Sequence, residues 1–493
     1  MSENLIKKLK QSLKNNPSNR VLVDQLANVY AQRKDWHNAS ECYEVYLALN
    51  KQDADGFFNY AYNLRFAEKY EQSIVQYRKA LALHISQPEE IHVNIAVILA
   101  DYLRLEEQAI NELKIALKIN KSYIPALYNL ANLYENEGDR EQAQLFFSAI
   151  IKINPKYYDA LARLAQIKKF SDKSDELITK LLVACDDHNI NPSTKINVYF
   201  ALGKAFDDCG EYEKAFHFFQ QANKLDKNIS TTYDAVAHEK FIENITEVFN
   251  SKLSESFTTI SDAEPIFICG MFRSGSTLVE QILAAHPKLT AGGEREFFIR
   301  LVESSLSPYP SSVLSTELEK FNVIAQDYLN ELEDTFPEAD YIIDKRPENY
   351  LFVGLIKILF PKARFIYTER NFLDNCLSVY FLRLGNRMNY SLDLLDTAHY
   401  YNMQSQLMNF WQTKYSHSIH TINYDELIKQ PKHEISQLLQ FLNLGWDEDC
   451  LNFHKIKNTV KTASVWQVRK PLYSTSSGRW KNYKEYIPNL LEK

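Results

Sequence analysis

The hydrophobic and polar positions of the chain change their period near its middle. Up to about residue 253, apolar residues recur at the spacing of amphipathic helices. From about residue 262 onward, short apolar runs alternate with helical patterns. The pattern therefore predicts two domains, a helical one over residues 1–253 and one that mixes strands and helices over residues 262–493.

The helical half contains a recurring triplet of a small residue, an aromatic or apolar residue, and a second small or apolar residue. Its period is near 34 residues, and its instances are Ala39/Tyr43/Tyr46, Ser73/Tyr77/Ala80, Ala109/Leu113/Ala116, Ala143/Phe147/Ile150 and Ala215/Phe219/Ala222. Small residues let antiparallel helices approach closely, and the larger ones fill the space beside them. The triplet resembles the tetratricopeptide repeat and predicts an α-solenoid. The step of 36 residues from Ser73 to Ala109 predicts a two-residue insertion in a loop.

Four short apolar runs in the second half are typical of buried strands: residues 266–269, 341–343, 364–368 and 419–422. Helical patterns follow them, from Thr277, Tyr350, Leu373 and Glu434. This alternation predicts a mostly parallel, doubly wound α/β sheet. Ligands of such sheets bind at the carboxyl ends of the strands, so the side chains that follow each run are the candidates for chemistry.

The loop after the first run has the spacing of a phosphate loop. Gly270 and Gly275 match the pattern G-x-x-x-x-G, but Ser276 stands where nucleoside-triphosphate enzymes have a lysine. That lysine contacts the β- and γ-phosphates, so its absence argues against hydrolysis of ATP or GTP. Backbone N–H groups and the positive end of the next helix still favour an anion. The polar side chains left to hold it are Arg273, Ser274, Ser276 and Thr277.

A second anion site is predicted after the third run. Arg370 lies on the loop, and Ser378 lies eight residues further on, two turns into the next helix. An arginine and a serine at this spacing can converge on one phosphate group. The C-terminal region adds positive charge, because residues 461–484 hold six basic residues and no acidic one.

Composition excludes several classes of function. A net charge of −7 disfavours non-specific binding to nucleic acid. Six scattered cysteines show no metal-binding spacing, which predicts reduced thiols and no metal site. The charged N-terminus and the lack of a long apolar run predict a cytoplasmic protein without a membrane span.

The motifs from residue 265 to residue 483 resemble sulfotransferases that use 3′-phosphoadenosine 5′-phosphosulfate (PAPS). Within that family they are most similar to protein-tyrosine sulfotransferases and their bacterial relatives with fused tetratricopeptide repeats. Residues 273–277 look like the 5′-phosphosulfate loop, and Arg370 with Ser378 looks like the 3′-phosphate pair. Glu294, twenty-one residues beyond Arg273, matches the catalytic base of the tyrosine enzymes, and residues 464–480 match the C-terminal cofactor loop.

The resemblance implies a role for each of these residues. Glu294 would take the proton from the acceptor hydroxyl, Arg273 and Lys345 would balance negative charge, and Ser464 would donate a hydrogen bond. No metal is implied, since the donor has no γ-phosphate. The residues implied to bind PAPS are Arg273, Ser274, Gly275, Ser276, Thr277, Arg370, Ser378, Tyr424, Lys470 and Arg479.

Plainer interpretations stay open at several of these positions. Glu294 can cap a helix, Lys345 can form a surface ion pair, and Tyr424 can serve packing alone. His286 is an alternative base, although its place at a helix end before Pro287 favours a structural role. Arg383 falls one residue out of register with a second arginine of the family and is left outside the predicted site.

The favoured function is transfer of a sulfuryl group to a protein or peptide tyrosine, with the repeats holding the substrate chain. The animal Golgi enzymes carry a membrane anchor and lumenal disulfides, which this sequence does not show, so a sugar, a lipid or a small phenol is an alternative acceptor. A P-loop kinase or nucleotide hydrolase is disfavoured by the missing lysine. A non-catalytic nucleotide-binding repeat scaffold is disfavoured by the complete set of candidate residues.

Overall fold

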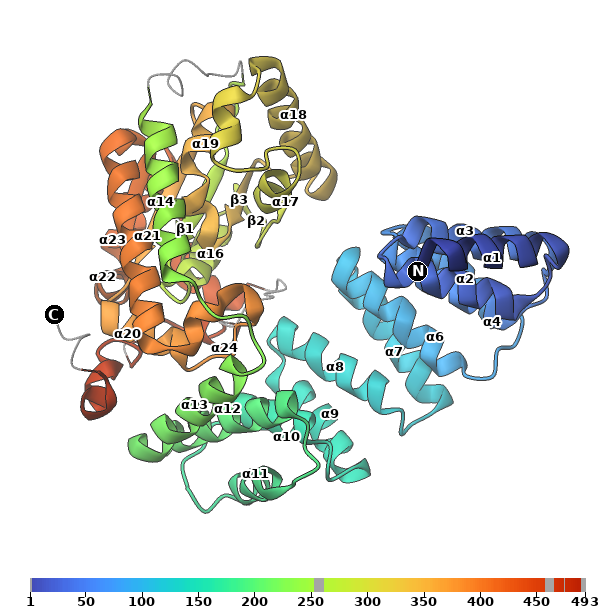
Figure 1. The fold of residues 1–493 in the computed structure, drawn as a ribbon. Helices are drawn as coiled ribbons and strands as arrows, with labels where there is room; N and C mark the ends of the chain where they lie inside the picture. The colour runs from blue at the N-terminus through green and yellow to red at the C-terminus, as the bar shows by residue number, and fades with distance from the viewer. Residues whose placement is uncertain (1, 252–260, 457–464, 474, 489–493) are drawn as a thin grey trace. The chain divides into compact units, whose positions relative to one another are not determined.

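A computed structural model describes residues 2–251, 261–456, 465–473 and 475–488 (Figure 1). Internal contacts divide the chain into two compact units. The first contains residues 1–135 and 139–160, and the second contains residues 136–138 and 161–493. The α/β domain and the last tetratricopeptide-like helices thus share the second unit.

The first unit is built from antiparallel helix pairs. Its helices are α1 (Ser2–Asn15), α2 (Arg20–Gln32), α3 (Trp36–Leu49), α4 (Ala54–Phe66), α5 (Tyr70–Ala82), α6 (Pro88–Val97) with the π-helical turn η1 (Ile98–Tyr102), α7 (Glu106–Ile119), α8 (Ile124–Glu137) and α9 (Arg140–Ile153). Several of them begin at a polar cap. The carboxylates of Asp35, Asp53 and Asp139 each accept a hydrogen bond from a backbone N–H in the first turn of the following helix.

The predicted triplets form the contacts between paired helices. Ser73, Tyr77 and Ala80 have 0% exposed surface. The Ser73 hydroxyl also donates a hydrogen bond to the Ala61 carbonyl oxygen at 2.6 Å, which ties α5 to α4. The triplets are therefore packing residues, and the solenoid prediction is confirmed.

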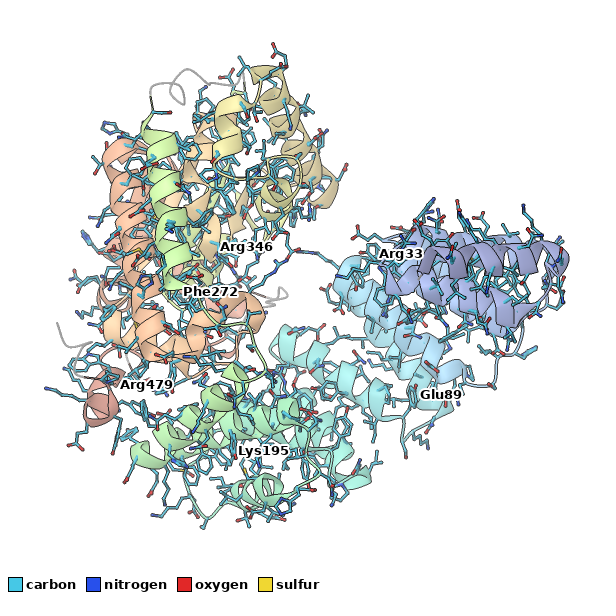
Figure 2. The ribbon with its side chains drawn as sticks, viewed as in Figure 1. Arg33, Glu89, Lys195, Phe272, Arg346 and Arg479 are labelled. Carbon is cyan, nitrogen blue, oxygen red and sulfur yellow. The ribbon has the colours of Figure 1, made fainter. Side chains whose placement is uncertain are left out.

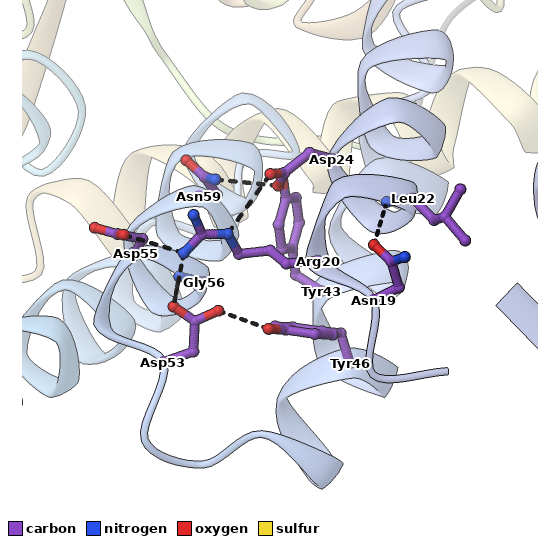
Figure 3. A network of polar contacts seen from close by, with 10 residues as sticks. All are labelled: Asn19, Arg20, Leu22, Asp24, Tyr43, Tyr46, Asp53, Asp55, Gly56 and Asn59. Carbon is purple, nitrogen blue, oxygen red and sulfur yellow. Dashed lines mark hydrogen bonds and ion pairs between the residues drawn. The ribbon is translucent and has the colours of Figure 1, made fainter. Parts of the chain in front are cut away.

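Polar contacts fasten α2, α3 and α4 to one another (Figure 3). Tyr43 donates to Asp24 Oδ1 at 2.6 Å, and Tyr46 donates to Asp53 Oδ2 at 2.7 Å. Arg20 donates to the other oxygen of Asp53 at 3.1 Å. Asp53, the cap of α4, thus links three helices through a single carboxylate.

The predicted loop insertion before Ala109 is wrong. Helix α6 and the turn η1 that continues it hold 10 and 5 residues, against 13 in α4. The extra residues therefore lie inside the helix. A π-helical turn accommodates them because each of its hydrogen bonds spans one residue more than in an α-helix.

The second unit carries most of α10 (Tyr158–Ile167) and the last repeat helices, α11 (Glu176–Asp186), α12 (Pro192–Asp208) and α13 (Tyr212–Lys227). Helices α12 and α13 lie in close contact. A Cβ added to Gly203 would be 2.6 Å from Phe219 Cδ1, so glycine is needed where the two helices meet.

The α/β domain contains a five-stranded parallel sheet in the order β2-β3-β1-β4-β5. Its strands are β1 (Ile266–Gly270), β2 (Leu289–Ala291), β3 (Tyr341–Lys345), β4 (Arg364–Glu369) and β5 (Ile419–Asn423). The four predicted strands are confirmed. Strand β2 escaped prediction because three residues are too few to show an apolar run, and at the edge of the sheet it pairs only with β3.

Helices cover both faces of the sheet. The helices of this domain are α14 (Ala235–Asn250), α16 (Ser276–Ala284), α17 (Phe297–Glu303), η2 (Ser311–Ser315), α18 (Leu318–Thr335), η3 (Pro347–Leu351), α19 (Val353–Leu359), α20 (Phe372–Tyr380), η4 (Asn386–Leu392), α21 (Leu394–Lys414), η5 (Ser416–Ser418), α22 (Tyr424–Lys429), α23 (Pro431–Phe441), η6 (Glu448–Lys455), α24 (Val465–Val468) and η7 (Arg479–Tyr486).

Alternate residues of β1 separate two hydrophobic cores. Phe267 packs in one core with Phe249 of α14 and Trp411 of α21. Ile268 packs in the other, with Ile282 of α16. This two-sided burial is what a doubly wound sheet requires. Helix α14 contributes its buried face to the first core, and the boundary near residue 253 stays a prediction because residues 252–260 lie outside the described ranges.

The sequence predicts reduced cysteines and no membrane span. The six cysteines are free thiols, as their spacing predicts. Among the described helices, none combines the length and the hydropathy needed to cross a membrane.

We expect Gly203→Ala to lower the free energy of unfolding by about 1–3 kcal/mol, because the added methyl group overlaps the Phe219 ring. The helix propensity of alanine acts in the opposite direction but is smaller. Urea denaturation measures the difference. Gly445→Ala is the control, since nothing lies within 4 Å of the added Cβ, and its effect should stay within about 0.5 kcal/mol. Equal effects of the two substitutions would contradict the close contact.

Candidate functional site

Candidate side chains follow all five strands at one edge of the sheet. Parallel strands bring their carboxyl ends to the same edge. In sheet order this edge presents Glu294 after β2, Lys345 at the end of β3, Arg273 after β1, Arg370 after β4 and Tyr424 after β5. The order in space differs from the order in sequence, and it places the phosphate-type loop in the middle.

The loop after β1 has a backbone conformation that residues with a side chain rarely adopt. Gly270 and Gly275 have φ angles of 146° and 104°, and Arg273 has a φ of 67°. A Cβ at Gly270 would lie 2.5 Å from the Thr368 carbonyl oxygen, and a Cβ at Gly275 would lie 2.8 Å from the Tyr424 ring. Both glycines are therefore required by close approach as well as by conformation.

The side chains of Ser274, Ser276 and Thr277 are buried beneath the loop. Ser274 is buried, donates to the Met271 carbonyl oxygen at 2.6 Å, and lies 2.7 Å from the Thr368 hydroxyl. Its side chain thus holds the loop closed. Ser276 and Thr277 are the first two residues of α16, where backbone N–H groups have no partner within the helix and favour an anion.

A pocket opens on the β4–β5 side of the loop. Seven of the residues predicted to bind the donor line it: Arg273, Gly275, Arg370, Ser378, Tyr424, Lys470 and Arg479. Ser274, Ser276 and Thr277 are not among its lining residues. The pocket joins the phosphate-type loop to the second anion site that the sequence predicts.

Two arginines of the pocket lie close together. Arg273 Nε donates to Ser378 Oγ at 3.2 Å, and Arg370 Nη1 donates to the Arg273 carbonyl oxygen at 3.2 Å. Arg370 also stacks over the Tyr424 ring at 5.0 Å, so Tyr424 does more than fill space. Burial, together with the charge of Arg370, lowers the pKa of Arg273 to about 10. A bound anion would offset both the burial of the Arg273 charge and its repulsion by Arg370.

The structure adds residues that sequence reasoning missed. Gln467 accepts a hydrogen bond from Arg273 Nη2 at 2.8 Å, within the C-terminal segment already singled out. Buried Asp374 accepts from the backbone N–H groups of Gly478 and Trp480 and so holds the C-terminal loop against α20. No sequence signal marked Asp374. Ser464 lies outside the described residues, so its predicted role stays a prediction.

On the β2–β3 side, Glu294 and Lys345 form an ion pair. Lys345 Nζ donates to Glu294 Oε1 at 2.6 Å, and the Lys345 side chain is fully buried, so its surface interpretation is wrong. The Glu294 side chain keeps 30% exposure and is accessible to an acceptor. Glu296, not Glu294, occupies the N-cap of α17, which removes the capping alternative.

A second carboxylate lies behind this pair. Glu280 of α16 is buried, accepts a hydrogen bond from the Gly293 N–H at 3.0 Å, and has its other oxygen 3.8 Å from Lys345 Nζ. Burial raises the pKa of Glu280 to about 7, although Lys345 opposes the shift. One lysine thus lies between two carboxylates. The sequence analysis did not single out Glu280.

Two residues with alternative assignments lie elsewhere. His286 is buried, and its Nδ1 accepts a hydrogen bond from the Lys288 N–H at 3.2 Å, which agrees with a structural role. Arg383 donates to Asp226 Oδ2 at 3.1 Å and does not line the pocket. Within the described ranges, no group of three or more His, Cys, Asp or Glu residues could hold a metal ion.

Family comparisons agree with this architecture. Residues 265–448 match the model of the "Sulfotransferase family". Residues 22–56, 107–167 and 196–229 match tetratricopeptide repeat models.

Several individual proteins are similar to parts of this chain. An uncharacterized protein of Aquifex aeolicus (strain VF5) is 30% identical over 386 residues, which cover 75% of this chain and 50% of that protein. The chain therefore spans half the length of this relative. Protein-tyrosine sulfotransferase 1 of Danio rerio is 24% identical over 249 residues, which cover 46% of this chain and 68% of that protein. A solved sulfotransferase domain from the curacin biosynthetic pathway aligns at 19% identity with a TM-score of 0.33, over 45% of this chain and 92% of that domain.

We expect Glu280→Gln to change how stability depends on pH. Because the folded state holds the Glu280 proton up to a pKa of about 7, against an ordinary 4.5, wild-type stability falls as the pH rises between these values. The glutamine variant lacks this loss. Its free energy of unfolding, relative to wild type, should rise by up to about 3 kcal/mol between pH about 4.5 and about 7.5.

Urea denaturation at the two pH values measures this change. Glu338→Gln, at an exposed position, is the control and should follow the wild-type curve. A difference between Glu280→Gln and wild type that stayed constant with pH would show that the Glu280 proton is not linked to folding.

Proposed function

Because residues 265–448 of this chain form a sulfotransferase-family domain that follows tetratricopeptide repeats, we propose that the protein transfers a sulfuryl group from PAPS to a hydroxyl group. The proposed acceptor is a tyrosine of a protein or peptide. The observation that carries the proposal is the division of the sheet edge, with a cationic pocket on one side of the loop and a carboxylate–lysine pair on the other.

The pocket suits the donor's negative groups. Arg370 Nε is buried and, among the described residues, has no hydrogen-bond partner, and the nearby Arg273 has a lowered pKa. Both features favour an anion in this pocket. Arg370 and Ser378 would hold the 3′-phosphate, and the loop and the start of α16 would hold the 5′-phosphosulfate. When bound, the donor supplies the sulfuryl group and a leaving phosphate.

The β2–β3 side suits the acceptor. Glu294 Oε2 would accept the proton of the acceptor hydroxyl, which makes the oxygen a better nucleophile. Lys345 Nζ, held by the carboxylate at 2.6 Å, would orient Glu294 and offset negative charge that develops nearby. The order Glu294, Lys345, Arg273 along the sheet edge supports a direct in-line transfer across the loop.

A tyrosine acceptor is supported by relatives named protein-tyrosine sulfotransferase, which match at 22–25% identity. The repeats would bind the protein that carries this tyrosine, since stacked helix pairs present extended binding surfaces. Sugar, lipid and small-phenol acceptors are the alternatives that an acceptor assay separates.

The donor is tested by titration calorimetry with 3′-phosphoadenosine 5′-phosphate (PAP) and with ATP. We expect PAP to bind at least about tenfold more tightly, because the pocket provides a second phosphate site and the loop lacks the triphosphate lysine. Transfer of radiolabelled sulfate from PAPS to an acidic tyrosine peptide, and to its phenylalanine counterpart, tests the acceptor. Tight binding of ATP without binding of PAP would refute the proposal.

Two substitutions should separate catalysis from donor binding. Glu294→Gln should reduce the transfer rate by about 10²–10⁴-fold while leaving the Kd for PAP unchanged, because it removes the base alone. Arg370→Ala should weaken PAP by about 10–100-fold, because it removes charge-assisted hydrogen bonds to phosphate. Glu296→Gln, with 52% of its side chain exposed, is the matched control and should retain the wild-type rate. Full activity of Glu294→Gln would exclude Glu294 as the base.

A further inference from the structure

The last repeat is joined to the α/β domain by polar contacts. Asn223 of α13 is buried, and its amide donates to the Tyr380 carbonyl oxygen at the end of α20 at 2.9 Å. Arg383, just beyond α20, donates to Asp226 of α13 at 3.1 Å and to Asn197 of α12 at 2.9 Å. These contacts join the segment at and just beyond the end of α20 to α12 and α13.

Aromatic rings fill the space between the same elements. Phe219 of α13 stacks on Phe381 with ring centroids 4.1 Å apart. Phe381 in turn meets Tyr483 of η7 edge to face at 4.8 Å. Phe219 belongs to the last triplet of the repeat pattern, so a residue that packs the solenoid also packs the α/β domain.

One charged contact links this repeat to the donor pocket. Arg479, which is labelled in Figure 2, lines the pocket. Its Nη2 lies 2.6 Å from Asp207 Oδ2 near the end of α12. Tyr483 donates a hydrogen bond to the other oxygen of Asp207. The Arg479 guanidinium also lies 5.2 Å from the centroid of the Phe381 ring. Burial lowers the pKa of Arg479, but Asp207 outweighs it and raises that pKa above its ordinary value.

We propose that Asp207 positions Arg479 in the donor pocket, so that the last repeat is a working part of the donor site. This inference rests on the proposed binding of PAPS. A guanidinium has five N–H donors, so the contacts of Arg479 with Asp207 and Tyr483 leave further donors for the ligand. An arginine held by a carboxylate and by a ring loses less side-chain freedom when a phosphate binds than a free arginine does.

A different role for Asp207 would change the Kd in the opposite direction. If Asp207 only neutralised Arg479, its removal would increase the positive charge in the pocket and tighten the binding of a phosphate compound. Positioning predicts weaker binding. The sign of the change in Kd therefore distinguishes the two roles.

The test uses the full-length protein and PAP as the probe. Asp207→Ala should raise the Kd for PAP about tenfold. In the transfer assay the KM for PAPS should rise, whereas kcat should stay within about twofold of the wild-type value. Asp207→Asn keeps the side-chain volume and one acceptor oxygen, so it should raise the Kd for PAP less, by about threefold. This variant replaces the alanine variant if the latter does not fold. Asp226→Ala is the matched control, because Asp226 holds Arg383 at the same interface but does not line the pocket. Its Kd should stay within about twofold of wild type.

A double-mutant cycle separates positioning from general destabilisation. In an Arg479→Ala background, Asp207→Ala should cause no further change in Kd. An additive loss in that background, an unchanged Kd or a tighter Kd for Asp207→Ala would overturn the inference. If the wild-type protein binds PAP and Asp207→Ala binds it equally well, only this inference fails. If the wild-type protein does not bind PAP, the proposed function fails with it.

Discussion

The parallel pairing of β1 with a neighbour on each side is the constraint on which the site depends. Hydrogen bonds register Ile268 with Lys345 of β3 and with Ile366 of β4. Neighbouring strands lie about 4.8 Å apart, so the loop that leaves β1 has candidate side chains one strand spacing away on both sides. A register slip of one residue would turn Lys345 to the opposite face of the sheet and away from Glu294. The chemistry of the site therefore follows from backbone pairing in the core.

Charge is distributed unequally along this edge. On the β2–β3 side, Lys345 lies between Glu280 and Glu294, so the buried ammonium is compensated within the protein. On the other side, Arg273 and Arg370 lie close together, and their guanidinium groups donate to the Ser378 hydroxyl and to the Arg273 carbonyl oxygen. The charge of Arg370 disfavours the charge of Arg273, and a ligand that supplies negative charge offsets this repulsion. The first side therefore holds a compensated charge pair, whereas the second side favours an anion.

The last repeat of the solenoid packs against the α/β domain. A terminal repeat has an apolar face that no further repeat covers, and solenoids usually cap it with polar residues. Here Phe219 of α13 meets Phe381 of the α/β domain, and Asp226 meets Arg383. The α/β domain thus serves as the cap of the repeats. Since α20 and η7 also border the pocket of Arg273 and Arg370, the cap and this pocket share structural elements.

The sequence by itself determined the elements and the loop, because both depend on local order along the chain. The triplet spacing predicted which residues pack between helices, and four apolar runs predicted strands. Two glycines and a missing lysine predicted an anion loop without triphosphate chemistry. Only the tertiary structure decided the partners of charged residues. Glu280 meets Lys345, Asp374 meets Gly478, and Asp207 meets Arg479 across separations of 65 to 272 residues, which no local period encodes. A buried charge takes its role from whichever opposite charge the fold brings within hydrogen-bonding distance, and that depends on packing rather than on spacing in sequence.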